Sequence, residues 1–353
     1  MRSRLKFVLI VLLLAMVSCS KEEETPNAMP FIKAADMSYL PLIESEGGVF
    51  YNSQMVAEDA LRTLKESGCN TIRLRLWHSP SDHHSGFNEV KLLAQRVKRL
   101  GMKVWITVHY SDTWADPGQQ VKPSAWQNLS FNQLKIQFEQ YTTQIVTQIR
   151  PDIFQIGNEI NNGFVYPEGN LTNNEAQFLL LLTSASNVIR TQSPSTKIML
   201  HYAGIQGASW FFSKTAAIDY DYIGLSYYPV WHGTDLSVLQ QTLTSLGQTY
   251  SKKVLIAETS YPFTLGWNDW TNNVLGQLNQ LHPNYPATLD GQKNFLHQIK
   301  STIQQTPNGI GFCYWGAEWI AFRGTQASNG SSWENQALWD FTHKAVPAMT
   351  VFK

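Results

Sequence analysis

The stretch NTIRLRLWHSPSDHHSGFNEVKLLAQRVKRLGMKVWITVHY, residues 70–110, combines two β-rich runs with an amphipathic segment between them. The runs NTIRLRLW (70–77) and MKVWITVHY (102–110) are typical of buried strands. The segment Glu89–Leu100 has the apolar spacing of a helix, and Gly101 stands where a helix would end. A strand, a helix and a second strand in this order predict two parallel neighbours in one sheet.

The same alternation continues along the chain in both directions. Six more β-rich runs are FIKAADMS (31–38), DIFQIG (152–157), KIMLHYA (197–203), YDYIGLSYY (220–228), KVLIAET (253–259) and GIGFCYWG (309–316). Further helices are predicted at Met55–Ser67, Gln133–Ile149, Glu175–Thr191, Leu236–Tyr250 and Gln292–Gln304. Eight strands alternating with helices predict an α/β fold, a (β/α)8 TIM barrel in a single domain over residues 31–353. A doubly wound sheet is the alternative, but no phosphate-binding glycine loop follows the first run.

The first 30 residues are not expected to belong to the barrel. Residues 1–18 combine three cations with the apolar run Phe7–Val17, which has the length of a signal peptide and is short for a membrane span. Cys19 follows a small residue, as in the lipidation site of bacterial lipoproteins, although an ordinary signal peptide with an incidental cysteine is the alternative. Residues 19–30 predict a flexible tether, and the acidic run Glu22–Glu24 resembles a surface-export signal. We therefore expect a bacterial outer-membrane lipoprotein, exposed at the cell surface and anchored through the lipid alone.

The composition argues against one class of partner and favours another. Lys and Arg number 27, as do Asp and Glu, and no basic block supports nucleic-acid binding. Charged residues make up 15% of the chain and aromatic residues 12%, a balance that suits a cleft for carbohydrate. Cys69 and Cys313 lie in apolar runs without zinc-site spacing, so we expect buried free thiols rather than a disulfide. We expect the protein to act as a monomer.

Polar and aromatic residues gather where the predicted strands stop. In a barrel of parallel strands the carboxyl ends meet at one rim, and active sites are built there. The candidate site residues are Arg73, Arg75, His109, Asp112, Asn158, Glu159, His201, Tyr228, Trp231, Glu258 and Trp315. Taken singly, each has a structural explanation, because Asp caps helices, Arg pairs inside barrels and Trp packs.

Glu159 and Glu258 carry the functional prediction, because they end the fourth and the seventh apolar runs. Strands four and seven lie across a barrel from each other, so two carboxylates there can converge on one bond. Hydrolysis of a glycosidic bond requires such a pair, one to protonate the leaving oxygen and one to attack the anomeric carbon. Arg73 or Arg75 would hold the attacking carboxylate charged, and Asn158 would bind a sugar hydroxyl.

Metal-dependent hydrolysis is the mechanistic alternative. The nine histidines are scattered without HxH or HExxH spacing, and no EF-hand-like spacing occurs. We therefore expect neither a metal nor another cofactor in the reaction. A non-catalytic glycan-binding protein on the same fold is a further alternative, and the presence of both Glu159 and Glu258 argues against it.

Four ordered motifs resemble one family of enzymes. They are HYSDTWADPGQQ (109–120), GNEINNG (157–163), IGLSYYPVWHG (223–233) and ETSYPFT (258–264), and the resemblance extends from Asp36 to Trp319. They are similar to glycoside hydrolase family 53, the endo-β-1,4-galactanases. The resemblance implies a retaining enzyme in which Glu159 is the acid/base and Glu258 the nucleophile. It also implies that β-1,4-galactan, as in type I arabinogalactan, is the polysaccharide that is cut internally.

The family pattern implies more about the cleft. It places next to the scissile bond the residues Arg73, His109, Asn158, Tyr228 and Trp315. Two positions depart from the pattern, because Gly316-Ala317 stands where a Glu-Pro pair is expected and Tyr166 where a Trp is common. Both departures are expected at the rim of the cleft. Related β-glycanases of the same superfamily, acting on mannan, xylan or β-glucan, are the alternative in substrate.

Overall fold

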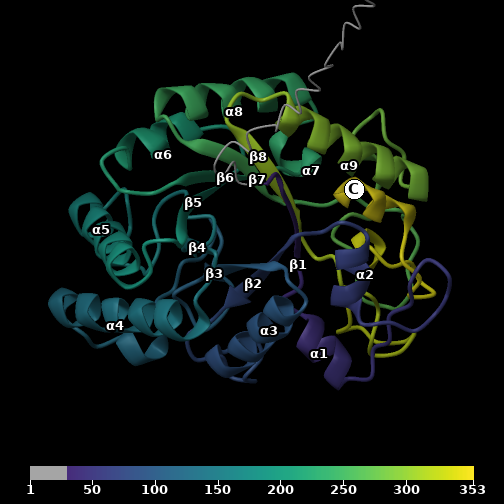
Figure 1. Ribbon diagram of the computed structural model, residues 1–353, viewed down its shortest axis with the longest axis horizontal. Helices are drawn as coiled ribbons and strands as arrows, with labels where there is room; N and C mark the ends of the chain where they lie inside the picture. The colour runs from purple at the N-terminus through teal and green to yellow at the C-terminus, as the bar shows by residue number, and fades with distance from the viewer. Residues whose placement is uncertain (1–29) are drawn as a thin grey trace, which may run out of the picture. The chain divides into compact units, whose positions relative to one another are not determined.

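The computed structural model describes residues 30–353, and in this part of the chain the strands close into a barrel. Eight parallel strands pair in chain order, and the last pairs with the first. They are β1 (Ile32–Asp36), β2 (Thr71–Leu76), β3 (Lys103–Val108), β4 (Ile153–Ile156), β5 (Lys197–Ala203), β6 (Tyr222–Ser226), β7 (Lys253–Thr259) and β8 (Gly309–Tyr314). Figure 1 shows these strands at the centre of a ring of helices. The predicted (β/α)8 TIM barrel is confirmed.

The helices cover the outside of the barrel (Figure 1). They are α1 (Leu40–Ser45), α2 (Ala60–Glu66), α3 (Phe87–Arg99), α4 (Phe131–Ile149), α5 (Glu175–Gln192), α6 (Ala208–Lys214), α7 (Pro229–His232), α8 (Leu236–Thr249) and α9 (Leu289–Gln304). All six predicted helices are present, whereas the short helices α1, α6 and α7 were not predicted. The helix α2 begins later than predicted, because the Asp59 carboxylate accepts the Leu61 N–H at 2.8 Å and caps the helix there.

Alternate side chains of each strand point to opposite sides of the barrel wall. The outer faces pack beneath the helices in one large apolar cluster, to which Ile72, Leu74 and Leu76 of β2 belong. A smaller apolar cluster fills the barrel interior near the amino ends of the strands, with Trp105 of β3 and Met199 of β5 among its members. Further along the same inward faces the buried side chains become polar. The functional site therefore begins above an apolar plug.

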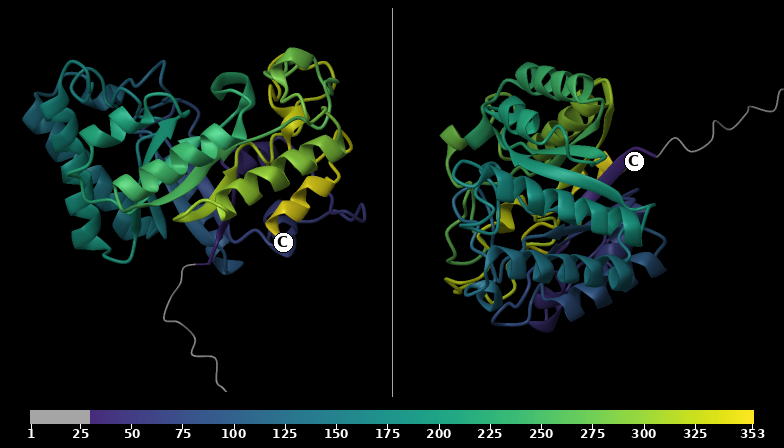
Figure 2. Two further views of the ribbon diagram at one scale, coloured as in Figure 1. Left: turned by 90° about the horizontal axis from the view of Figure 1, so that it is seen from above. Right: turned by 90° about the vertical axis from the view of Figure 1, so that its left-hand side faces the viewer.

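The C-terminal 3-10 turn η4 (Pro347–Phe352) packs against α9 and the outer side of β8. The Phe352 ring stacks on Phe312 of β8 with ring centroids 5.9 Å apart and an interplanar angle of 7°. Lys300 of α9 donates to the Val351 carbonyl at 3.0 Å. Figure 2 shows the end of the chain, in yellow, next to α9. The tail of the chain is thus part of the outer layer around the barrel.

Cys69 and Cys313 are free and buried, as predicted. Burial raises the pKa of the Cys69 thiol to about 12, so this thiol is unreactive at neutral pH. Within residues 30–353, no helix combines the length and apolar character that crossing a membrane requires. The expected signal peptide (1–18), the lipidation site Cys19 and residues 19–29 of the expected tether lie outside the described residues.

Candidate active site

A cavity of about 520 Å³ opens at the carboxyl ends of the strands. Nine of the eleven candidate site residues line this cavity, namely Arg73, Arg75, His109, Asn158, Glu159, Tyr228, Trp231, Glu258 and Trp315. They come from the ends of the strands or from the segments that follow them. The barrel thus brings together residues that are spread over most of the chain.

Glu159 reaches the cavity because the backbone turns sharply after β4. Gly157 has a φ of +75°, and a Cβ at this position would collide with the Ile160 side chain, so only glycine fits. Glu159 itself has a φ of +47°, a left-handed conformation that is unfavourable for a side chain of this size. The Gln120 side chain holds the turn by donating to the carbonyls of Asn158 at 2.8 Å and Glu159 at 3.3 Å.

Glu258 reaches the cavity through an irregularity in β7. Leu255 and Ala257 point into the barrel, so strict alternation would turn Glu258 outward. The register with β6 shifts at this point, and Ser226 pairs with Glu258 although Leu225 pairs with Ile256. The register with β8 shifts at the same place. This bulge turns the Glu258 carboxylate towards the cavity.

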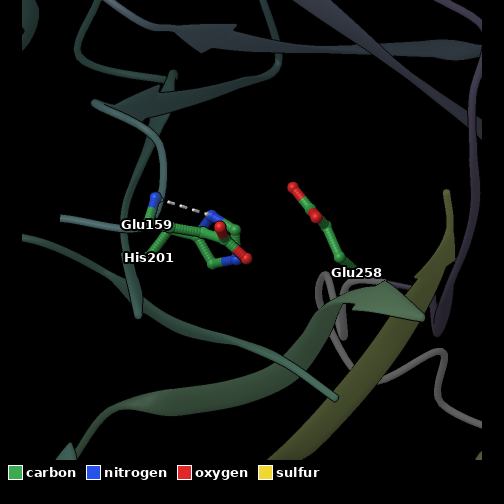
Figure 3. A group of neighbouring side chains, drawn as sticks. All are labelled: Glu159, His201 and Glu258. Atoms are coloured by element: carbon green, nitrogen blue, oxygen red, sulfur yellow. Dashed lines mark hydrogen bonds between the residues drawn. The ribbon is translucent and has the colours of Figure 1, made fainter. Parts of the chain in front are cut away.

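The two carboxylates face each other across the cavity. Figure 3 shows the side chains of Glu159 and Glu258 extending into the same space from opposite sides. One oxygen of Glu159, one oxygen of Glu258 and one ring nitrogen of His201 lie within 4.8 Å of one another. The two acids are therefore close enough to act on a single bond.

Arg73 organises the floor of the cavity. It is 1% exposed, and its guanidinium donates to Asp36 Oδ2 at 2.9 Å, to Glu258 Oε1 at 2.6 Å and to Asn158 Oδ1 at 2.9 Å. The Tyr228 hydroxyl donates to the other oxygen of Glu258 at 3.2 Å. Both oxygens of Glu258 are therefore held by donors, and the buried cation is matched by two carboxylates.

The surroundings of the two acids affect their pKa values differently. Burial, and then the charge of Glu258, raise the pKa of Glu159 to about 8. Burial also raises the pKa of Glu258, but the charge of Arg73 and the hydrogen bonds from Arg73 and Tyr228 act against that rise. At neutral pH the site therefore favours a proton on Glu159 and a negative charge on Glu258.

Aromatic rings form part of the cavity wall. Trp315 packs against Trp319 and Trp333, with ring centroids 5.1 Å and 4.7 Å away. Trp231 is 54% exposed and lies beside Tyr228, with ring centroids 5.2 Å apart. Flat apolar rings with polar groups nearby are suited to stacking against the apolar faces of sugars.

Arg75 packs among aromatic rings. Its guanidinium carbon lies 4.4, 4.2 and 4.1 Å from the ring centroids of Tyr39, Trp77 and Trp114. It also donates to Ser85 Oγ at 2.7 Å, and burial is the main cause that lowers its pKa. Cation–π contacts on this scale stabilise a buried charge, and the nearby charge of Asp36 acts in the same direction. Of the two arginines expected near the attacking carboxylate, Arg73 bonds to Glu258 and Arg75 is occupied in this cage.

Two candidate residues, Asp112 and His201, do not line the cavity. Asp112 accepts the Ser79 N–H at 3.0 Å and the Ser124 N–H at 2.8 Å, so its carboxylate ties two loops together. His201 is fully buried, with Nδ1 3.3 Å from the Glu159 backbone nitrogen (Figure 3). The polar atoms of Asp112 and His201 are thus engaged by protein groups, and their expected substrate contacts stay predictions.

Several residues of the site were not among the candidates, and three buried polar ones are Asp36, Gln155 and Ser226. Asp36 ends β1 and pairs with Arg73 at 2.9 Å. Gln155 and Ser226 occupy inward positions of β4 and β6 and are both fully buried. A buried polar side chain in an otherwise apolar strand needs a hydrogen-bonding partner, and this signal was available in the sequence.

Glu159, His201 and Glu258 are also the group of potential metal ligands found among residues 30–353. Arg73 already supplies a positive charge 2.6 Å from Glu258. The His201 Nδ1 atom faces the backbone N–H of Glu159, which is a donor. A cation would have to displace these contacts, so the arrangement suits proton transfer better than metal binding.

Residues 32–352 match the family model described as glycosyl hydrolase family 53. The chain belongs to glycosyl hydrolase family 53. Within this family it is 34% identical to the arabinogalactan endo-β-1,4-galactanase of Cellvibrio japonicus, over 100% of this chain and 97% of that protein. It is also similar to the solved family 53 catalytic domain of Ignisphaera aggregans, with a TM-score of 0.87 and 36% identity over 92% of this chain and 97% of that one. A solved fungal β-1,4-galactanase matches with a TM-score of 0.80 and 27% identity over 91% of this chain and 98% of that one.

The family 53 match covers the barrel from β1 to η4 and therefore contains the whole cavity. The chain is accordingly a glycoside hydrolase. The residues at its two departures from the expected family pattern are not among those that line the cavity. Gly316 and Ala317 are buried, and a Cβ on Gly316 would meet the Trp333 ring. Tyr166 is half-buried, and its hydroxyl donates to the Asn162 carbonyl at 3.0 Å.

Proposed function

We propose that this family 53 enzyme hydrolyses internal β-1,4-galactosidic bonds of galactan and type I arabinogalactan with retention of configuration. The observation that carries the proposal is the convergence of Glu159 and Glu258 within 4.8 Å in one cavity. The similar Cellvibrio japonicus relative, named an arabinogalactan endo-β-1,4-galactanase, supports galactan as the substrate. Because the cavity opens to solvent at the carboxyl ends of the strands, it suits a bond within a polymer.

Glu258 is the nucleophile in this proposal. Its carboxylate attacks the anomeric carbon while the bond to the leaving oxygen breaks, which gives a glycosyl-enzyme. Arg73 at 2.6 Å and the Tyr228 hydroxyl at 3.2 Å keep the carboxylate ionised and oriented. The close approach of the two acids supports retention, since carboxyl groups lie about 5–5.5 Å apart in retaining enzymes and about 6.5–9.5 Å apart in inverting ones.

Glu159 is the general acid and then the general base. In the first step its proton passes to the glycosidic oxygen, which leaves as a sugar hydroxyl. In the second step the Glu159 carboxylate takes a proton from water, whose oxygen attacks the anomeric carbon and releases Glu258. A pKa of about 8 supports this role, because the acid is protonated at neutral pH and is still able to give up its proton.

Sugar binding is assigned to neutral groups and aromatic rings. The His109 Nδ1 atom accepts the Ala115 N–H at 3.0 Å, so Nε2 carries the hydrogen and is free to donate to a hydroxyl. Burial, followed by the charge of Arg75, lowers the pKa of His109 well below its usual value, so the ring is neutral. Trp231 and Trp315 provide stacking surfaces.

Digestion of purified substrates tests the proposal directly. We expect short galacto-oligosaccharides from β-1,4-galactan early in the reaction, together with a rapid fall in polymer length. Mannan, xylan and β-glucan serve as controls for the sister activities of the superfamily. Activity on one of these polymers and none on galactan would reject the proposed substrate, and binding without hydrolysis of any of them would reject the catalytic proposal.

Azide tests the assignment of the nucleophile. Glu258→Ala should have almost no activity on galactan but should fold and bind it. Because the removed side chain leaves space beside the anomeric carbon, azide should restore turnover of an activated aryl β-galactoside and give a glycosyl azide of inverted configuration. Glu44→Ala, which alters an exposed carboxylate that pairs with Arg96, is the control and should turn over normally without azide. Absence of the azide product would contradict the nucleophile role.

We also propose that the chain is an outer-membrane lipoprotein displayed on the cell surface. The support is the small residue before Cys19, the tether 19–30 and the acidic run Glu22–Glu24. Cys19→Ala should release the protein from membranes. Deletion of Glu22–Glu24 should leave it lipidated but protected from protease added to whole cells. Unchanged protease accessibility of the deletion variant would refute surface export through this run.

A further inference from the structure

Glu159 is held from behind by a chain of buried polar side chains. The Ser226 hydroxyl donates to Glu159 Oε1 at 2.5 Å. His201 Nε2 lies 2.9 Å from the same hydroxyl oxygen, and His201 Nδ1 lies 2.9 Å from Gln155 Nε2. Gln155, His201 and Ser226 are all fully buried, so these contacts are shielded from water.

The donor and acceptor roles along these side chains are set at Gln155. Its Oε1 atom accepts from Trp105 Nε1 at 3.1 Å and from the Thr107 hydroxyl at 3.1 Å. The indole nitrogen of tryptophan is only a donor, which identifies the Gln155 atom facing it as the oxygen. The amide nitrogen must then face His201 and donate to Nδ1. The His201 ring therefore carries its hydrogen on Nε2.

A second donor supports the same tautomer. The Glu159 backbone N–H points to His201 Nδ1 at 3.3 Å, and a backbone N–H cannot reverse its direction. Asn158 Oδ1 also lies 3.3 Å from Nδ1, but this oxygen accepts from Arg73 at the shorter distance of 2.9 Å. Burial and the charge of Arg73 lower the pKa of His201 well below its usual value, so the ring stays neutral.

The tautomer of His201 determines what Ser226 does. A hydrogen on Nε2 is donated to the Ser226 oxygen, so the single hydroxyl hydrogen of Ser226 is left for Glu159 Oε1. The carbonyl oxygen of a carboxylic acid is a better acceptor than its hydroxyl oxygen, so this bond favours Oε1 as the carbonyl oxygen and the catalytic proton on the other oxygen. Among the described residues, no protein donor contacts the other oxygen, Oε2.

We propose that Gln155, His201 and Ser226 are positioning residues that keep Glu159 Oε1 as an acceptor and so place the catalytic proton on Oε2. This inference rests on the proposed acid/base role of Glu159. In the first step the Oε2–H bond breaks and the proton is transferred to the glycosidic oxygen. The charge left on Glu159 is stabilised by the Ser226 hydroxyl. In the second step Oε2 takes a hydrogen from water, and the chain returns to its initial state.

The proposal makes a specific kinetic prediction for Ser226→Ala. Loss of the hydroxyl leaves the Glu159 carboxylate without its donor, so the pKa of Glu159 rises and the alkaline limb of the kcat/KM profile moves to higher pH. On galactan oligosaccharides kcat/KM should fall by at least about tenfold, because proton transfer is less well directed. On a dinitrophenyl β-galactoside it should change little, since that leaving group needs no proton.

Ser186→Ala is the matched control. Ser186 is a buried serine of α5 whose hydroxyl donates to the Asp219 carbonyl at 2.6 Å, away from the cavity. It should change neither the pH profile nor the ratio of the kcat/KM values for the two substrates. Equal loss on both substrates in Ser226→Ala, with an unmoved alkaline limb, would show a merely structural serine. If Glu159→Ala also loses both substrates equally, the acid/base assignment itself fails, which separates the two hypotheses.

The tautomer is tested on the unaltered enzyme by NMR of histidine labelled with ¹⁵N, with the His201 signals assigned from a His201→Gln sample. We expect a neutral ring with hydrogen on Nε2 and none on Nδ1 from about pH 5 to 8, the range over which an unperturbed histidine would titrate. This measurement depends on neither substrate nor activity. A hydrogen on Nδ1, or a charged ring within this range, would overturn the proposal.

Discussion

Arg73 joins three strands at the floor of the cavity, because it bonds to Asp36 of β1, to Asn158 after β4 and to Glu258 of β7. A guanidinium presents its donors in a fixed planar fork, whereas the ammonium group of lysine is a compact point charge. The geometry of arginine, and not only its charge, is therefore needed here. Removing the cation would leave two buried carboxylates without a positive charge to balance them.

Arg73→Lys should separate these two contributions. The charge is kept but the fork is lost, so we expect kcat/KM to fall by at least about a hundredfold. With a weaker partner the pKa of Glu258 rises further, and the acidic limb of the kcat/KM profile should move to higher pH. Arg96→Lys, at an arginine that pairs with Glu44 on the surface, should leave both limbs in place. An unmoved acidic limb in Arg73→Lys would contradict the proposed contact.

The pH dependence of the wild-type enzyme follows from the two acids. The proposed mechanism needs Glu258 ionised and Glu159 protonated, so activity should be lost at low pH as Glu258 takes up a proton. It should be lost again as the pH rises through about 8, where Glu159 gives up its proton. Measurement of kcat/KM from about pH 3 to about pH 10 should give a bell-shaped profile. In Glu159→Gln, assayed on an activated substrate, the alkaline limb should disappear.

Glu159 also links stability to pH. Its pKa is raised on folding from 4.5 to about 8, so the folded state binds a proton that the unfolded state releases. The associated stability is fully present below pH 4.5 and is lost as the pH rises to about 8. Glu159→Gln has no proton to lose at this position. Its midpoint of thermal unfolding should therefore rise relative to that of the wild type as the pH increases from 4.5 to about 8. Parallel unfolding curves at all pH values would show that burial of Glu159 costs no stability.

At the scale of the elements, the two glutamates reach the cavity by different backbone devices. After β4 the chain turns at Gly157, with a φ of +75°, and presents Glu159. In β7 a register shift turns Glu258 inward against the alternation of its neighbours. Both devices depart from ideal geometry, and the surrounding contacts hold them in place.

Gly157→Ala tests the turn after β4. The added Cβ meets the Ile160 side chain, and the alanine must adopt a left-handed backbone conformation. We therefore expect the free energy of unfolding to fall by about 3 kcal/mol or more. Displacement of Glu159 should also lower kcat by at least about tenfold. Gly101→Ala has nearly the same φ, +74°, with only the Lys65 ammonium at 3.6 Å, and should lose less stability and no activity. Equal losses of stability and activity in both variants would show that the turn does not specifically require glycine at position 157.

At the scale of the barrel, the acids and the C-terminal turn lie in different layers. The carboxyl ends of the strands hold the acids in the cavity, while η4 packs on the outer side of the barrel with Phe352 stacked on Phe312. Stability and activity should therefore respond separately to substitutions in the outer layer and in the cavity.

Phe352→Ala tests this separation. Phe352 is fully buried, and removal of its ring leaves a cavity, so urea unfolding should show a loss of about 3–5 kcal/mol. At 25 °C, where the variant remains folded, kcat and its pH profile on galactan should match the wild type. Phe352→Leu, which fills part of the space, should lose less stability. A shifted pH profile in either variant would mean that packing in the outer layer is coupled to the cavity.

Local sequence patterns determined the barrel and its two acids. Apolar runs and helical spacing act over a few residues, so all eight strands and six of the nine helices of residues 30–353 could be predicted from NTIRLRLW (70–77) and its counterparts. Glu159 and Glu258 were found because each ends such a run. Helix starts were less accurate, since the cap at Asp59 depends on one side-chain hydrogen bond.

Only the tertiary structure decided how the polar residues divide their roles. Arg73 and Glu258 are 185 positions apart, and nothing local distinguishes Arg73 from Arg75, although one bonds to Glu258 and the other lies in an aromatic cage. Which acceptors a buried donor finds depends on barrel closure and on irregularities such as the β7 bulge. For the same reason the sequence determined that His201 would end up near the strand ends, while the fold placed it beneath Glu159, out of the cavity and in contact with Ser226.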